Sequence, residues 1–299
     1  PTPVQFGDIA GLDAGASKGA GLGNQLLAHI RETQAIAHIV RCFRDQNVVH
    51  VAGDIEPLAD IETINTELML ADIAIVERAL ERTTRHTKVG DKAALTLKAV
   101  LTQGMDRLNK GIAIRSGNFT RYELSLLDEL NLITAKPMLY VANIDESEIK
   151  GNEQLRAVEL LAKREGTVWV SVCAAIEAEL ADMDEEDKAQ FLRQLGLPEP
   201  GLNRIIRAGY GLLGLLTFFT AGPKEVRAWT APQGAKAPQA AGVIHSDFER
   251  GFIRAEVTAF DDYIALRGAQ GAKEAGKLRL EGRDYVVQDG DVIHFRFNV

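Results

Sequence analysis

The segment VQFGDIAGLDAGASKGAGLGNQ, from Val4 to Gln25, constrains the fold of this 299-residue chain more than any other segment. A short apolar run ends at Asp8, and five glycines follow within thirteen residues, at positions 11, 15, 19, 21 and 23. A strand, an acidic residue and a glycine-dense loop before a helix are the usual layout of a nucleotide site in an open α/β sheet. The alternative is a plain strand-to-helix turn in which the glycines supply only backbone freedom.

Asp8 and Gly11 are the residues of this segment with a candidate role on a nucleotide. Asp8 stands where P-loop NTPases place an aspartate that holds Mg²⁺. Gly11 has no Cβ, so its backbone N–H can approach a γ-phosphate. Leu12 occupies the place of the glutamine that orients water in Ras-like proteins, and leucine cannot bond to water. Among the six histidines, His50 is the candidate for positioning water, because it lies beside a glycine-containing loop near the predicted sheet edge; a purely structural histidine is the alternative.

Several segments resemble the YchF (Obg-like ATPase) branch of the Obg-related P-loop NTPases: DIAGL, GASKGAGLGN, RETQAIAHIVRCF, NIDE and QDGDVIHFRFNV. The resemblance covers essentially the whole chain. It implies an α/β fold with a Ras-like P-loop NTPase core truncated at its N-terminus, an antiparallel helical-arm insertion and a C-terminal β-grasp (TGS) domain. It also implies that His50 matches a histidine position of the family.

The motif NIDE, Asn143 to Glu146, follows a predicted strand that begins at Lys136-Pro137. Related GTPases have NKxD, whose aspartate accepts hydrogen bonds from guanine. Here Ile144 replaces the lysine and Glu146 is one methylene longer than aspartate, and an unpaired buried polar group costs about 1–3 kcal/mol. The change disfavours guanine and resembles the family's NxxE, which implies that Asn143 and the backbone of Ile144 contact adenine. A strand that ends in a polar turn is the alternative.

The tripeptide Cys173-Ala174-Ala175 follows the apolar strand VWVSV and stands where the family has its last base-contacting loop. The family's phosphate loop and switch I are not found in this sequence. The nearest match to GxxxxGK[ST] is GAKEAGKL, from Gly271 to Leu278, which ends in a leucine that cannot bind magnesium. We therefore expect the chain by itself to bind nucleotide poorly and to be inactive, even if the full-length parent protein is an ATPase that uses Mg²⁺.

Hydrophobic periodicity divides the chain into four parts. Apolar residues repeat at 3-4 spacing from Ile61 to Ile75 and from Ala94 to Leu108, which predicts two helices of an arm. Strands alternate with helices on both sides of the arm, and we expect a strand at Val4–Phe6, a buried strand at His38–Phe43 and a helix from Leu202 to Leu216. Strand-like segments, among them RDYVV from Arg283 to Val287, dominate the last part. We predict a nucleotide-binding domain at 1–58 and 133–213, the arm at 59–132 and the TGS domain at 214–299.

Composition excludes several classes of protein. A net charge of −8 argues against general coating of nucleic acid, and two cysteines are too few for a disulfide framework. The longest apolar run, Tyr210 to Ala221, is too short to span a bilayer. We expect a cytoplasmic monomer without a membrane partner.

The resemblance implies a ribosome-associated, magnesium-dependent ATPase that prefers ATP to GTP and regulates translation or a stress response. Its partner is the ribosome (large subunit) or RNA, contacted through the TGS domain and the arm. A regulatory RNA- or ribosome-binding module, in which nucleotide is a switch without turnover, is the first alternative. A dinucleotide-binding oxidoreductase using Gly19, Gly21 and Gly23 is the second, and it is disfavoured because this cluster does not join a strand tightly to a helix.

Overall fold

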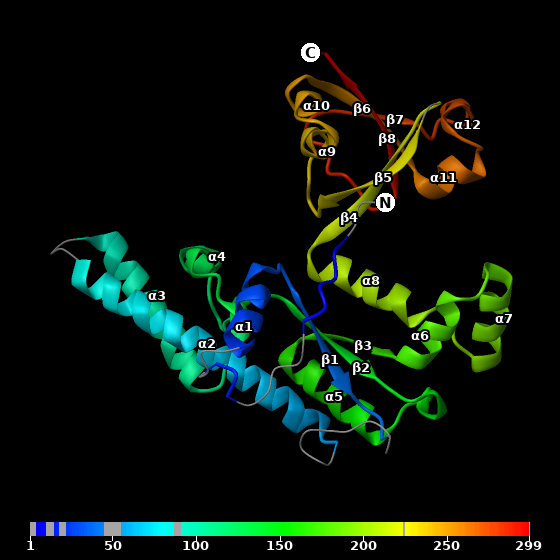
Figure 1. Cartoon of the computed structure of the whole chain (residues 1–299). Helices are drawn as coiled ribbons and strands as arrows, with labels where there is room; N and C mark the ends of the chain where they lie inside the picture. Colours follow the sequence, from blue (N-terminus) through cyan, green and yellow to red (C-terminus); the bar gives the residue numbers. More distant parts are fainter. Residues whose placement is uncertain are drawn as a thin grey trace. The chain divides into compact units, whose positions relative to one another are not determined.

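The computed structural model describes residues 4–9, 15–17, 22–44, 55–86, 91–223 and 225–298. The chain divides into two compact units, one from Asp8 to Leu212 and one that combines Pro1–Gly7 with Leu213–Val299. Mixed sheets and helices in both units confirm the predicted α/β class (Figure 1). None of the helices in the described ranges has the length and apolar character that a membrane crossing requires.

The first unit contains a parallel three-stranded sheet in the order β1 (Ile36–Arg41), β2 (Met138–Asn143) and β3 (Val168–Val172). β2 is the central strand, and its first five residues are buried, as expected for a parallel strand that is covered on both faces. One face packs against helices that include α2 (Pro57–His86) and α5 (Glu153–Glu165), and the other packs against α8 (Gly201–Leu212). The remaining helices of this unit are α1 (Leu22–Glu32), α3 (Lys92–Asn109), α4 (Arg121–Leu127), α6 (Ala174–Ala181) and α7 (Glu185–Leu195), with short 3-10 turns at Ile114–Ser116, Asp128–Leu130, Ile133–Ala135 and Glu146–Glu148.

The helices α2 and α3, a pair to which we refer as the arm, are the two helices that the apolar stripes predict, and they pack along each other (Figure 1). Val76 of α2 lies in one cluster of buried side chains with Val100, Leu101 and Leu108 of α3, whereas Ile61 and Leu68 of the first stripe pack in the core beside the sheet. Asp91 begins α3 by accepting a hydrogen bond from the backbone N–H of Ala94, an ordinary N-cap. The two apolar stripes in the sequence were therefore sufficient to predict this pair of helices.

The second unit contains a five-stranded sheet in the order β5-β4-β8-β6-β7. β4 pairs with β5 in antiparallel and with β8 in parallel orientation, and helices α9 and α10 lie against the sheet. The elements are β4 (Leu215–Ala221), β5 (Val226–Pro232), α9 (Ala237–Ile244), α10 (Ser246–Arg250), β6 (Phe252–Ala259), α11 (Phe260–Ala265), α12 (Ala269–Glu274), β7 (Arg279–Glu281) and β8 (Asp291–Phe297).

Four expectations about elements are wrong. Residues 4–9 form no strand, since a strand requires a hydrogen-bonded neighbour and none of the described strands pairs with them. The strand expected to be buried at His38–Phe43 is the edge strand β1, in which the Ile39 side chain is 62% exposed. The helix expected to reach Leu216 ends at Leu212, because Gly214 adopts a positive φ of 61° and the apolar run continues as β4. The expected strand RDYVV makes only an isolated bridge between Val286 and Lys236.

Candidate functional site

The loops that follow the three parallel strands meet at one edge of the sheet. The backbone N–H of Cys42, after β1, donates to the carbonyl of Asn143 at the end of β2 (2.7 Å). The N–H of Ile144 donates to the carbonyl of Val172 at the end of β3 (2.8 Å). The carboxyl edge of a parallel sheet is where open α/β proteins bind ligands.

Asn143 joins two of the predicted base-contacting segments. Its side-chain Oδ1 accepts a hydrogen bond from the backbone N–H of Ala174 (3.0 Å), the first residue of α6. Only the oxygen of an amide can accept from an N–H, so this bond also fixes the orientation of the carboxamide. The side-chain Nδ2 makes no hydrogen bond with other described residues, which leaves two N–H donors for a ligand.

Ile144 and Glu146 lie in different environments. The Ile144 side chain is buried in the core, and its N–H is already engaged, so its backbone can offer a ligand only the carbonyl oxygen. Glu146 is exposed at the start of a 3-10 turn. Between them, Asp145 accepts from both the hydroxyl and the N–H of Ser147 (2.6 and 2.9 Å), and these bonds hold the pKa of Asp145 below its usual range. Asp145 therefore shapes the turn.

Cys173, Ala174 and Ala175 form the start of α6. The Cys173 side chain is buried, whereas Ala174 and Ala175 are exposed on the first helical turn. Their side chains are methyl groups, so a flat ring can approach the backbone closely. The structure therefore brings Asn143, Ile144 and this tripeptide together at one edge, as the sequence predicted.

The predicted phosphate side is described only in part. The Asp8 side chain is exposed, and the neighbouring Ile9 packs against the core cluster that contains Ile144. Gly11, Leu12 and His50 lie outside the described residues. The described residues contain no group of three or more metal-ligating side chains. A single exposed carboxylate fits Mg²⁺, which is usually held by one or two carboxylates together with phosphates and water.

Asn152 is a residue of this edge that the sequence reasoning missed. Its Oδ1 caps α5 by accepting from the N–H of Leu155 (2.7 Å), while its Nδ2 donates to the Cys42 carbonyl (2.6 Å) and to Glu148 (2.7 Å). An asparagine before an amphipathic helix signals the cap, but nothing in the sequence signals the bond to residue 42.

Burial, with Asp60 and Glu148 nearby, raises the pKa of the Cys42 thiol to about 12, so this thiol is inert at neutral pH.

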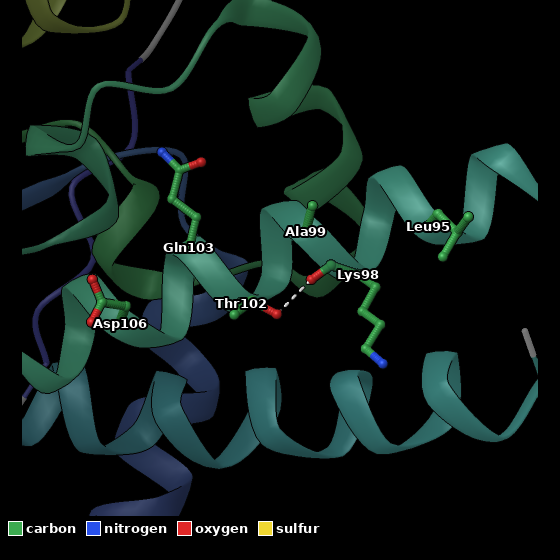
Figure 2. A pocket seen from close by; sticks show the side chains of 6 residues that line it. All are labelled: Leu95, Lys98, Ala99, Thr102, Gln103 and Asp106. Carbon is green, nitrogen blue, oxygen red and sulfur yellow. Dashed lines mark hydrogen bonds between the residues drawn. The ribbon is translucent and has the colours of Figure 1, made fainter.

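A shallow hollow lies elsewhere on the surface, along one side of α3 (Figure 2). Its lining repeats at three- and four-residue spacing, as one stripe of a helix does. The residues are Leu95, Lys98, Ala99, Thr102, Gln103 and Asp106, and none of them belongs to the sheet edge described above.

Comparison with known proteins decides the family. A family model named YchF-GTPase_C and described as "Protein of unknown function (DUF933)" matches residues 215–298. The Ribosome-binding ATPase YchF of Haemophilus influenzae is 57% identical over 299 residues, which are 100% of this chain and 82% of the relative. The chain belongs to the YchF family.

Other members agree in sequence and in fold. The Ribosome-binding ATPase YchF of Bacillus subtilis is 52% identical over 302 aligned residues, covering 100% of this chain and 82% of the relative. The structure of the Schizosaccharomyces pombe YchF GTPase superposes with a TM-score of 0.83 at 34% identity, covering 95% of this chain and 78% of that one. The names of the relatives differ on the nucleotide, since the two bacterial proteins are called ATPases and the Schizosaccharomyces pombe protein a GTPase.

Proposed function

We propose that the protein is a cytoplasmic, monomeric, ribosome-associated ATPase that hydrolyses the γ-phosphate of ATP and regulates translation or a stress response. The relatives named Ribosome-binding ATPase YchF support the activity and the partner. The proposed preference for ATP over GTP rests on the hydrogen-bonding groups of Asn143 and Ile144 at the sheet edge.

The hydrogen bond from Ala174 to Asn143 carries this proposal, because it leaves the Asn143 Nδ2 as a donor beside the start of α6. Both purines present N7 as an acceptor, but adenine adds a 6-amino donor where guanine has the acceptor O6. The Ile144 N–H is engaged by Val172, so the carbonyl oxygen is what the Ile144 backbone can offer a base. A carbonyl oxygen matches the 6-amino group of adenine and repels the O6 of guanine.

The remaining site residues take the following roles in the proposal. Asp8 would hold Mg²⁺, directly or through water, and the ion would supply positive charge that neutralises the phosphates during hydrolysis. Gly11 approaches the γ-phosphate and His50 orders the attacking water. Glu146 borders the base, and the exposed start of α6 at Cys173, Ala174 and Ala175 lies against the ring.

Ribosome contact is assigned to the arm and to the C-terminal unit, which we propose to be the TGS domain at 214–299. The parallel pairing of β4 with β8 beside the β4-β5 hairpin supports a β-grasp fold. On the arm, the hollow along α3 includes Leu95, whose side chain is 53% exposed (Figure 2). We keep the boundaries 1–58, 59–132 and 133–213 for the other parts.

The substitution Asn143→Asp tests the base contact. Aspartate keeps an oxygen for the Ala174 N–H but replaces the Nδ2 donor with a second acceptor, so ATP affinity should fall about 10- to 100-fold. Asn203→Asp, at an exposed position of α8, is the control and should leave affinity unchanged. Titration of the full-length protein with labelled ATP and GTP measures both variants. Tighter binding of GTP than of ATP by the wild type would contradict the proposal.

The alternative function is a ribosome- or RNA-binding module in which nucleotide acts as a switch. Turnover that rises when ribosomes are added supports the ATPase. Tight ATP binding without turnover, with and without ribosomes, supports the switch.

A further inference from the structure

A buried carboxylate on the arm helix α2 holds the glycine-dense loop. Glu67 is only 5% exposed, and it lies 52 residues along the chain from Gly15 and 50 from Ser17. Its Oε1 accepts the backbone N–H of Gly15 (2.7 Å), and its Oε2 accepts the N–H of Ser17 (2.8 Å). Each carboxylate oxygen therefore fixes one end of a three-residue turn.

The energetics make this attachment specific. A buried charge is costly unless it is hydrogen-bonded, and hydrogen bonds to an ionised group are about twice as strong as neutral ones. The Glu67 carboxylate consequently favours the turn conformation in which the N–H groups of Gly15 and Ser17 both point at it, and it disfavours other conformations of this turn.

The turn is also packed against the start of α1. A Cβ added at Gly23 would lie 2.5 Å from the carbonyl oxygen of Ala16, so glycine is required for this close approach. The Ser17 hydroxyl is buried and has no hydrogen-bond partner within the described residues. The turn is thus held from two sides, by Glu67 of the arm and by the first turn of α1, and one polar group inside it is left unsatisfied.

We propose that Glu67 is a positioning residue that holds the turn at residues 15–17 and couples this turn to the arm. A displacement of α2 by a partner moves the carboxylate and releases or reorders the backbone of residues 15–17. The inference deepens the proposed function, because it rests on this loop being the segment that approaches the γ-phosphate.

Hydrogen–deuterium exchange tests the attachment. Glu67→Gln keeps the shape of the side chain but removes its charge and one acceptor. The exchange of residues 15–17 should become about tenfold faster or more, while the exchange of β2 stays unchanged. Glu62→Gln, at an exposed position of the same helix, is the matched control and should behave as wild type. Unchanged exchange of the loop overturns the proposal, and so does an equal increase in β2, which would show that Glu67 stabilises the unit as a whole.

ATP turnover by the complete protein tests the coupling. In Glu67→Gln the kcat should fall about tenfold with KM for ATP within about twofold, and stimulation by ribosomes should be lost, because the loop acts on the reacting phosphate and not on the base. A kcat and a ribosome stimulation equal to wild type overturn the coupling. A wild-type protein without ATP turnover contradicts the proposed function instead, and the exchange experiment still decides whether Glu67 holds the loop.

Discussion

The two faces of the three-stranded sheet are built from different chemistry. The face toward α8 is aliphatic, with Leu139, Val141, Val170 and Val172 packed against side chains of that helix. The face toward α2 and α5 carries apolar side chains together with a set of polar ones at or near its surface: His38, Asn65, Glu67, Asp72, Arg115, Tyr140 and Glu165.

The two faces differ in how strictly their contacts fix the positions of the packed helices. Aliphatic packing is non-directional and tolerates small shifts of α8. On the polar face, Asp72 accepts from Arg31 of α1 and from Ile133 and Thr134, and Tyr140 donates to Glu165 at the end of α5. Directional bonds thus fix the position of the arm helix relative to α1, to α5 and to the glycine-dense loop. We infer that the directional bonds of the polar face fix the positions of the elements packed there, whereas the aliphatic face contributes non-directional packing.

Removal of Asp72 is expected to cause the largest loss of stability. This carboxylate is fully buried and accepts four hydrogen bonds, from Arg31 Nη1 (2.9 Å), Ile133 N–H (3.1 Å) and both the N–H and the hydroxyl of Thr134 (2.7 Å each). Asp72→Ala leaves these donors unpaired, so the free energy of unfolding should fall by about 3–5 kcal/mol. Urea denaturation measures the change.

The control for Asp72 is an ion pair on the surface of the arm. Asp106 pairs with Lys110 one helical turn away, and both side chains are exposed. Asp106→Ala should cost less than about 1 kcal/mol. Equal losses of unfolding free energy for the two variants would show that the buried bonds of Asp72 contribute no more to stability than an exposed ion pair does.

His38 should make the polar face sensitive to acid. Burial, reinforced by the Arg115 charge, lowers the pKa of His38 from 6.5 to about 4. Between these two values the unfolded chain binds a proton that the folded chain does not, so the free energy of unfolding falls as the pH drops through this window. The contribution is fully present above pH 6.5, and at most about 3 kcal/mol is lost by pH 4.

The comparison of His38→Gln with wild type isolates this effect. Unfolding measured at several pH values from 7 to 5 should show a shallower loss of stability for the variant. Parallel curves for wild type and His38→Gln would mean that folding leaves the pKa of His38 unchanged, which would contradict the prediction.

The sequence predicted what local patterns determine. The heptad stripes predicted α2 and α3, and the apolar run after Lys136 predicted β2. The resemblance placed NIDE and Cys173-Ala174-Ala175 in two base-contacting loops, and the structure joins these loops by the hydrogen bond from Ala174 to Asn143.

Contacts between distant residues were not predictable in the same way. Glu67 and Asp72 look like ordinary arm residues in the sequence. Heptad spacing predicts which side of α2 they occupy, but it does not predict which backbone N–H groups of other segments donate to them. The expected helix ran on to Leu216, and no strand was expected at Leu215–Ala221, since periodicity alone does not distinguish a buried strand from a buried helix. The strand expected at residues 4–6 is absent for another reason: a strand needs a hydrogen-bonded partner elsewhere in the chain, and the local sequence does not reveal one.

Truncation on the aliphatic face should have an intermediate effect. Val141 is buried between β2 and α8, and Val141→Ala removes two methyl groups that no other atoms replace, so about 2 kcal/mol should be lost. Val168→Ala, on β3 of the same sheet but exposed, should be nearly neutral. Amide exchange of residues 15–17 should not change in Val141→Ala. A faster exchange there would show that the aliphatic face also sets the geometry of the loop.

The smallest effect is expected for the Tyr140 hydroxyl. It donates to Glu165 Oε2 (2.8 Å), and Glu165 is only partly buried, so water can replace the lost donor in Tyr140→Phe. The free energy of unfolding should fall by about 1 kcal/mol, the usual net value of a hydrogen bond. Tyr122→Phe, at an exposed position of α4, is the control.

Burial raises the pKa of Tyr140 to about 12, so the hydroxyl stays a donor and the difference in unfolding free energy between Tyr140→Phe and wild type should be constant from pH 6 to 9. A difference that changes over this range would place a titrating group beside the hydroxyl, and the polar face would then respond to pH at Tyr140 as well as at His38.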